Sequence, residues 1–284
     1  MVSVHRPATL EEALAVRARL EATPLAGGTD LMVRLRRGAG ELPAFSKPVL
    51  LLDRLKELGT ISVREGRLEI GSLVTLEALA DSPLVPPVLR AVALSMAGPA
   101  IRGIATLGGN VCNASPAGDT LPFLFAVEAR ALLGSRAGRR ELPVEDFIAG
   151  PGSTRLHPDE LLLGVSLPAR LPAASLWRKV GTRRANALTK VSILALAERD
   201  AAGRPAGVRI ALGAVAPTAV RLRDVERFLE GRDAPLEAAE EDVIRGLVAA
   251  AVRPIDDQRS TAAYRRRVAG NLVLRAASGM LRPG

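Results

Sequence analysis

The sequence predicts an α+β protein in two parts, and three observations lead to that class. Helical and strand patterns alternate through the first part without the ~30-residue unit that a dinucleotide-binding parallel sheet repeats. A proline-rich segment, LPARLPAAS at 167–175, then interrupts the pattern and marks the expected domain boundary. Beyond it, strands of an antiparallel sheet are followed by three helical segments.

In the first part, residues 6–22 predict a helix that begins after Thr9 as its N-cap. Residues 23–38 predict a short strand, a glycine turn and a second helix that begins near Thr29 or Asp30. The remaining elements are, in order, a buried strand in 47–55, a hairpin through Glu65–Gly66 with a helix from near Thr75, a helix and turn in 82–105, a helix or strand in 119–134, a strand near the end of 139–168, strands in 179–200 and 206–222, and helices in 223–231, 240–252 and 261–278.

The composition is that of a globular protein with room for a large core, since 48% of the 284 residues are apolar and 24% are charged. A net charge of +9 raises the possibility of nucleic-acid binding. However, the arginines are scattered, usually near Glu or Asp, and aromatic residues make up only 2%, which leaves few rings for base stacking. We therefore expect no nucleic-acid partner, and a basic face that docks on an acidic protein remains open.

Cysteine and histidine content excludes several kinds of site. Cys112 is the only cysteine, so the chain can form no internal disulfide and no cluster or zinc site with several thiolates, and it is expected to pack rather than react. His5 and His157 lie far apart, and no metal site is expected. No apolar run reaches the ~18 to 20 residues of a membrane helix, and charges interrupt the N-terminus where a signal peptide would be apolar. We expect a soluble, cytoplasmic protein.

Two glycine pairs, Gly27-Gly28 and Gly108-Gly109, are the strongest candidates for a binding site. Glycine lets the backbone approach a ligand and point its amide groups inward, and such nests bind phosphate oxygens. Two converging nests would suit a pyrophosphate, with help from the helix N-termini behind them. A tight turn is the alternative for each pair, because neither fits G-x-G-x-x-G or the P-loop.

The second pair begins the stretch TLGGNVCNASPAGDTLP, residues 106–122, which predicts a long loop because it is too polar for a core strand and too broken for a helix. Asn110, Asn113, Ser115 and Asp119 are expected to order this loop and to reach ribose or flavin edges. The chain has no G-x-S-x-G elbow, no H-E-x-x-H and no thiol beside a histidine, and we expect no catalytic side chain. A ligand site without acid–base residues indicates a cofactor that performs the chemistry itself.

The two glycine motifs resemble the paired FAD-binding signatures of the flavoprotein (medium) subunit of molybdenum hydroxylases, the family of carbon monoxide dehydrogenase and xanthine dehydrogenase. The matching stretches are PLAGGTDLMVRLRRG at 24–38 and AIRGIATLGGNVCNASPAGDTLPFL at 100–124. Colinear landmarks extend the resemblance over the chain: RPATLEEALAV, VLLLDRLKELGTISVREGRLEIGSLVTLEAL, DELLLGVSLP, WRKVGTRRANALTKVSILALA and QRSTAAYRRRVAGNLVLRA.

The resemblance implies a fold and a domain organisation. An FAD-binding domain of the vanillyl-alcohol oxidase (PCMH) type would occupy 1–172, in subdomains of about 1–55 and 56–172. A small α+β domain of the carbon monoxide dehydrogenase flavoprotein type would occupy 173–284. FAD would lie between the two subdomains.

The resemblance also implies the residues that hold FAD. Two segments would surround the pyrophosphate, Asp119 would be an acidic FAD contact, and Leu162 and Lys179 would approach the isoalloxazine side, where a cation stabilises the reduced flavin. The full set is Leu25, Ala26, Gly27, Gly28, Thr29, Asp30, Leu31, Thr106, Leu107, Gly108, Gly109, Asn110, Asp119, Leu162 and Lys179. The chain departs from the family at Gly103, where Asn is usual, and at Met96, where animal xanthine dehydrogenases have a phenylalanine near the flavin.

The implied function is electron transfer. A partner molybdenum subunit would hydroxylate the substrate, a small subunit would pass electrons through 2Fe-2S clusters, and this chain would hand them to NAD, quinone or oxygen, within a dimer of heterotrimers. A stand-alone flavin-dependent oxidoreductase of the same fold is the alternative. The lone cysteine argues against the 4-hydroxybenzoyl-CoA reductase type, whose flavin subunit carries an iron–sulfur loop. The C-terminal helix, with Arg265–Arg267, is either a docking face or a plain surface helix.

Overall fold

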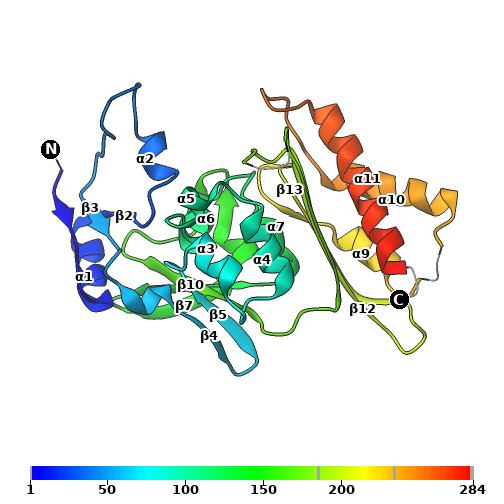
Figure 1. The fold of residues 1–284 in the computed structure, drawn as a ribbon, viewed down its shortest axis with the longest axis horizontal. Helices are drawn as coiled ribbons and strands as arrows, with labels where there is room; N and C mark the ends of the chain where they lie inside the picture. Colours follow the sequence, from blue (N-terminus) through cyan, green and yellow to red (C-terminus); the bar gives the residue numbers. More distant parts are fainter. Residues whose placement is uncertain (1, 184–185, 233–234, 282–284) are drawn as a thin grey trace. The chain divides into compact units, whose positions relative to one another are not determined.

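The computed structural model describes residues 2–183, 186–232 and 235–281 and confirms the predicted α+β class. Figure 1 shows the fold, with labels on those helices and strands for which there is room. They form two compact units. The first contains residues 1–85, 97–114 and 129–169, and the second contains residues 86–96, 115–128 and 170–284.

The first unit contains three sheets. A parallel sheet has the order β1-β3-β2, an antiparallel sheet has the order β4-β5-β10-β6-β7, and β8 pairs with β9. The strands are β1 (Val4–His5), β2 (Thr23–Leu25), β3 (Val49–Leu51), β4 (Ile61–Arg64), β5 (Arg67–Gly71), β6 (Arg130–Ser135), β7 (Gly138–Pro143), β8 (Ile148–Gly150), β9 (Ser153–Thr154) and β10 (Leu161–Pro168). The helices are α1 (Leu10–Leu20), α2 (Leu31–Arg34), η1 (Lys56–Gly59), α3 (Leu76–Asp81), α5 (Pro99–Arg102), α6 (Leu107–Asn113) and α8 (Val144–Phe147).

Local sequence signals explain the ends of several of these elements. The Thr9 hydroxyl accepts a hydrogen bond from the Glu12 amide, and the Thr75 hydroxyl accepts one from the Ala78 amide, so both predicted N-caps are confirmed. Glu65 and Gly66 both have positive φ, 49° and 74°, as the two central residues of a tight hairpin turn require.

The second unit is a four-stranded antiparallel sheet, β11-β12-β13-β14, with helices on both faces. In Figure 1, α9, α10 and α11 cover one face, and α4 and α7 pack on the other. Both faces of β12 are therefore buried, which its near-continuous apolar sequence indicates. The elements are α4 (Pro87–Leu94), α7 (Thr120–Ala126), β11 (Ala174–Val180), β12 (Val191–Arg199), β13 (Pro205–Gly213), β14 (Val220–Arg221), α9 (Arg223–Leu229), α10 (Ala238–Ala251) and α11 (Ala262–Leu281).

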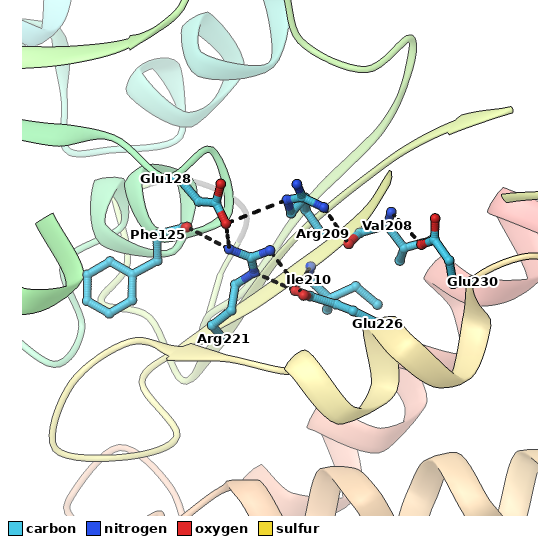
Figure 2. Close-up of polar contacts among 8 residues, drawn as sticks. All are labelled: Phe125, Glu128, Val208, Arg209, Ile210, Arg221, Glu226 and Glu230. Carbon is cyan, nitrogen blue, oxygen red and sulfur yellow. Dashed lines mark hydrogen bonds and ion pairs between the residues drawn. The ribbon is translucent and has the colours of Figure 1, made fainter. Parts of the chain in front are cut away.

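A buried arginine connects α7 to the sheet of the second unit (Figure 2). Arg221 donates to the Glu226 carboxylate on α9 and, at 3.1 Å, to Glu128 just beyond α7. Glu226 also accepts from the amide of Ile210 on β13 at 2.7 Å. The side chains of Arg221 and Glu226 are 3% and 9% exposed, so each charge depends on the other to offset its lost hydration.

The arginine cluster on α11 does not form a single exposed face. Arg265 is 3% exposed and donates inward to Asp257 at 2.8 Å, while Arg266 and Arg267 are exposed. Asp257 also binds the Arg259 guanidinium, and these bonds hold the pKa of Asp257 well below its usual range. Arg265 therefore anchors the start of α11 and is not available for docking.

Replacing Arg221 with Met should destabilise the protein by about 3 to 5 kcal/mol, because Glu226 would keep a buried charge without its partner. Arg209→Met is the matched control, since Arg209 also faces Glu128 but lies 3.9 Å away with a side chain that is 37% exposed. The control should cost less than about 1 kcal/mol. Equal losses in urea-unfolding free energy would contradict the role given to Arg221.

Asp257 should make the free energy of unfolding decrease as the solution becomes acidic. Because the folded-state pKa lies below the unfolded-state value of about 3.9, the stabilisation is complete above that value and is lost progressively as pH falls from there through the folded-state pKa. In unfolding curves measured from neutral to strongly acidic pH, Asp257→Asn should be less stable at neutral pH and lose less on acidification. Asp242→Asn, an exposed change on α10, should follow the parent protein at every pH.

Candidate functional site

The first glycine motif is a half-buried turn between β2 and α2. Gly28 has φ of +70°, a left-handed conformation that favours glycine, and its carbonyl accepts the amide of Met32 at 2.9 Å. Within the described part of the chain, the amides of Gly27, Gly28 and Thr29 donate no hydrogen bond. Successive unpaired amides in such a turn are a binding site for an anion.

This turn packs directly on the backbone that leads into the second glycine motif. A Cβ added to Gly27 would lie 1.8 Å from the carbonyl oxygen of Ile104 and 3.2 Å from the Cα of Ala105. Only glycine permits this approach. The structure thus brings the two predicted motifs together, as the pyrophosphate hypothesis requires.

The second motif is a helix over Leu107–Asn113, so the prediction of a long loop is wrong there. Thr106 caps the helix by accepting the Gly109 amide at 3.0 Å. A Cβ at Gly108 would lie 2.5 Å from the Cβ of Ser72, so this glycine allows α6 to approach the end of β5. Tertiary packing therefore outweighs the low helix propensity of the glycine pair.

The amides of the second motif are used inside the protein. Leu107 donates to the carbonyl of Val74 at 2.9 Å, Gly108 donates to Ser72 at 3.0 Å, and Asn110 donates to Thr106 at 3.0 Å. Together with the cap at Gly109, these bonds leave no amide nest over 107–110, and the predicted second nest is wrong. The side chain of Asn110, on α6, is half-buried.

The remaining predicted residue of the first unit is Leu162. It lies on β10, is 5% exposed and pairs with Leu133 of β6. A register shift follows between Leu162 and Gly164, and α6 packs against β10.

In the second unit, the structure pairs Asp119 with Lys179. The Lys179 Nζ donates to Oδ2 of Asp119 at 2.6 Å, and Thr189 Oγ1 donates to the other carboxylate oxygen at 2.5 Å. Burial raises the pKa of Asp119, while the Lys179 ammonium and the Thr189 hydroxyl oppose this by stabilising the carboxylate. The two hydrogen bonds are short and hold the buried carboxylate in one orientation.

Lys179 has a second partner at the end of α4. Its Nζ donates to the carbonyl oxygen of Ser95 at 3.0 Å, and Ser95 is the C-cap of that helix. The negative end of a helix dipole favours a cation there. An ammonium has three donors, and acceptors among the described residues use two of them.

Three residues of this geometry were missed by sequence reasoning: Ser72, Ser95 and Thr189. Ser95 and Thr189 lie 84 and 70 positions from the residues they bind, and no local pattern marks such a contact. In the sequence Ser72 is distinguished only by its small side chain, which allows α6 to approach the end of β5.

The two departures from the family pattern have different surroundings. A Cβ at Gly103 would meet its nearest neighbour, the carbonyl oxygen of Pro99, at an ordinary 3.5 Å. Glycine is therefore not required by packing at this position. Met96 is 8% exposed, so its side chain belongs to the interior of the second unit.

Other kinds of site find no support in the described residues. Among them, no three His, Cys, Asp or Glu side chains gather as metal ligands, and no helix has the length and apolar character to cross a membrane. Burial raises the pKa of the Cys112 thiol to about 12. It therefore lacks the thiolate character of a nucleophile.

Comparisons with known proteins point to one family. Residues 1–170 match the FAD binding domain in molybdopterin dehydrogenase, and residues 178–280 match the CO dehydrogenase flavoprotein C-terminal domain. The chain is 32% identical to the putative xanthine dehydrogenase FAD-binding subunit XdhB of Escherichia coli, over 93% of this chain and 90% of that protein. It is 30% identical to the carbon monoxide dehydrogenase medium chain of Hydrogenophaga pseudoflava, over 96% and 94%.

Solved structures agree with these sequence matches. Carbon monoxide dehydrogenase from Hydrogenophaga pseudoflava superposes with a TM-score of 0.86 at 28% identity, covering 96% of this chain and 95% of that one. Quinoline 2-oxidoreductase from Pseudomonas putida 86 gives a TM-score of 0.87 at 27% identity, covering 99% of each chain.

Gly27→Ala should disrupt the turn, because its methyl group would overlap the Ile104 carbonyl. We expect a loss of about 1 to 3 kcal/mol in unfolding free energy, the range for overpacked sites. Gly59→Ala is the control, since nothing lies within 4 Å of its added Cβ and its φ is ordinary. If both variants unfold at the same urea concentration, the close approach at Gly27 is not a constraint on the fold.

Proposed function

Since this chain belongs to the family of the FAD-binding domain in molybdopterin dehydrogenase, and is the FAD-binding medium subunit of an oxidoreductase of the carbon monoxide and xanthine dehydrogenase type, we propose that it is an electron-transfer subunit. In this proposal it accepts electrons from 2Fe-2S clusters of a partner subunit. It then passes them to an external acceptor, which would be NAD, quinone or oxygen.

The observation that supports this proposal most directly is the turn at Gly27–Thr29. Three neighbouring amides there have no acceptor within the described residues, and the turn is held against the segment that precedes Thr106. These features fit the pyrophosphate of a dinucleotide, and we assign its binding to the amides of the turn within Leu25–Leu31. Thr106–Asn110 would line the same ligand without an amide nest of its own. FAD bound there supplies the redox chemistry that the side chains of this chain lack.

We assign Asp119, Lys179 and Leu162 to the flavin end of the same ligand. Among the described residues Lys179 binds Asp119 and Ser95, which fix its position, and a fixed cation beside a flavin favours the reduction of the flavin. Asp119 keeps that cation in place, and buried Leu162 presents an apolar surface to a ring system.

The single cysteine supports a division of labour between subunits. A 2Fe-2S cluster is held by four ligands, usually thiolates, so this chain cannot hold one by itself. We therefore propose a small iron–sulfur subunit and a large molybdenum subunit as partners, assembled as a dimer of heterotrimers in the cytoplasm. We place the boundary between the FAD-binding domain and the C-terminal domain near residue 172.

Flavin binding should depend on the conformation of the turn at Gly28. A left-handed φ costs about 1 to 2 kcal/mol for a residue with a side chain, so Gly28→Ala should weaken FAD binding by about tenfold. Gly40→Ala is the matched control, since Gly40 has φ of +79° and no atom within 4 Å of an added Cβ. Affinity is measured by titrating flavin-free protein with FAD and following flavin fluorescence.

The control should bind FAD like the parent protein. Failure of the parent to retain flavin absorbance through desalting, both alone and within its purified complex, would contradict the proposed function. Turnover of an organic substrate by the chain alone would instead favour a stand-alone flavoenzyme.

A further inference from the structure

Asp119 stands at the start of α7 but does not cap it. The N-cap position of a helix favours Asp because its carboxylate accepts a hydrogen bond from the first turn. Here the side chain makes no such bond, and both oxygens point to other partners. The orientation of this carboxylate is therefore set by tertiary contacts and not by the helix it begins.

Thr189 is the contact that fixes one side of the carboxylate. Its Oγ1 lies 2.5 Å from Oδ1 of Asp119, and the two residues are 2% and 5% exposed. An ionised carboxylate only accepts, so the hydroxyl is the donor and the bond is charge-assisted. Thr189 lies just before β12, whereas Asp119 begins α7 on one face of that sheet.

The other oxygen of Asp119 fixes Lys179. With Oδ1 occupied by Thr189, Oδ2 is the oxygen that receives the Lys179 ammonium, at 2.6 Å. The carbonyl of Ser95 holds the ammonium from the end of α4. The Thr189 hydroxyl thus orients the Asp119 carboxylate, and the carboxylate in turn positions the Lys179 ammonium.

We propose that Thr189 is a positioning residue, whose hydroxyl orients Asp119 and thereby holds the Lys179 ammonium in one place for the flavin. The proposal rests on the proposed function for its last link, the contact of Lys179 with the flavin. Without the hydroxyl, a buried carboxylate oxygen has no donor, and the carboxylate is free to turn toward the first amides of α7 or to take Lys179 with both oxygens.

The test compares Thr189→Val, which keeps the shape and removes the donor, with Thr189→Ser, which keeps the donor. FAD affinity and the flavin midpoint potential are measured for the full chain. The valine variant should bind FAD about tenfold more weakly, with a lower midpoint potential, because losing one charge-assisted hydrogen bond has an effect of this order. The serine variant should remain near the parent protein. A serine variant as impaired as the valine variant would show that only packing matters.

A double-mutant cycle with Lys179→Gln tests whether Thr189 acts through the lysine. If it does, Thr189→Val should have little further effect on FAD affinity in the Lys179→Gln background. Fully additive effects would overturn the proposal.

A flavin-free measurement separates this proposal from the proposed function. Titration of the Asp119 carboxylate by carbon NMR should show its pKa raised further in Thr189→Val and not in Thr189→Ser, because the Thr189 hydroxyl stabilises the carboxylate. Lys179 is the charged group that acts on Asp119 in the described structure, and it is unchanged in both variants. An unchanged titration would overturn the positioning role. A shifted titration combined with normal flavin binding in Lys179→Gln would keep that role and reject the flavin contact.

Discussion

The contact between the Gly27 Cα and the Ile104 carbonyl is the constraint on which the site of the first unit depends. It joins two segments that lie 77 positions apart, 104 minus 27, without any side chain between them. A backbone contact of this kind fixes the position of the turn relative to residues 104–105. It therefore also fixes the direction of the amides of Gly27, Gly28 and Thr29, which have no acceptor among the described residues. The contact of Gly108 with Ser72 then places α6 on the same unit. The glycines serve first to pack backbone against backbone, and only the first pair also leaves donors for a ligand.

The second unit organises its polar groups by a different means. Lys179 and Asp119 lie between the ends of two helices, with the C-terminal carbonyl of α4 on the cation and the first residue of α7 as the anion. Burial raises the pKa of Asp119. The hydrogen bonds from Thr189 and to Ser95 give each group of the pair a second partner, so the pair has a fixed geometry. Arg221 acts similarly at the far end of α7, and both ends of this short helix are therefore held by charged contacts.

Sequence reasoning found the parts of this protein that depend on local chemistry. The caps at Thr9 and Thr75, the Glu65–Gly66 hairpin and the α+β class all follow from short-range patterns. It failed at residues 107–113, where glycine and asparagine indicate a loop but packing on Ser72 makes a helix. It could not find Thr189, because a threonine beside a strand carries no sign of a carboxylate 70 positions away. The inward contact of Arg265 was not predicted either, because its partner Asp257 lies in the loop before α11 and outside the helical pattern.

The way the chain divides between its two units has a consequence for synthesis. Residues 86–96 and 115–128, with α4 and α7, belong to the unit whose sheet is formed by residues after 170. Every residue of α7 is buried, and β12 and β13 supply much of the surface that covers it. A ribosome that has translated the chain only to residue 170 therefore displays an apolar helix without the strands that cover it. All residues of the first unit have been translated by then, whereas the second unit cannot complete its core until β12 and β13 have emerged.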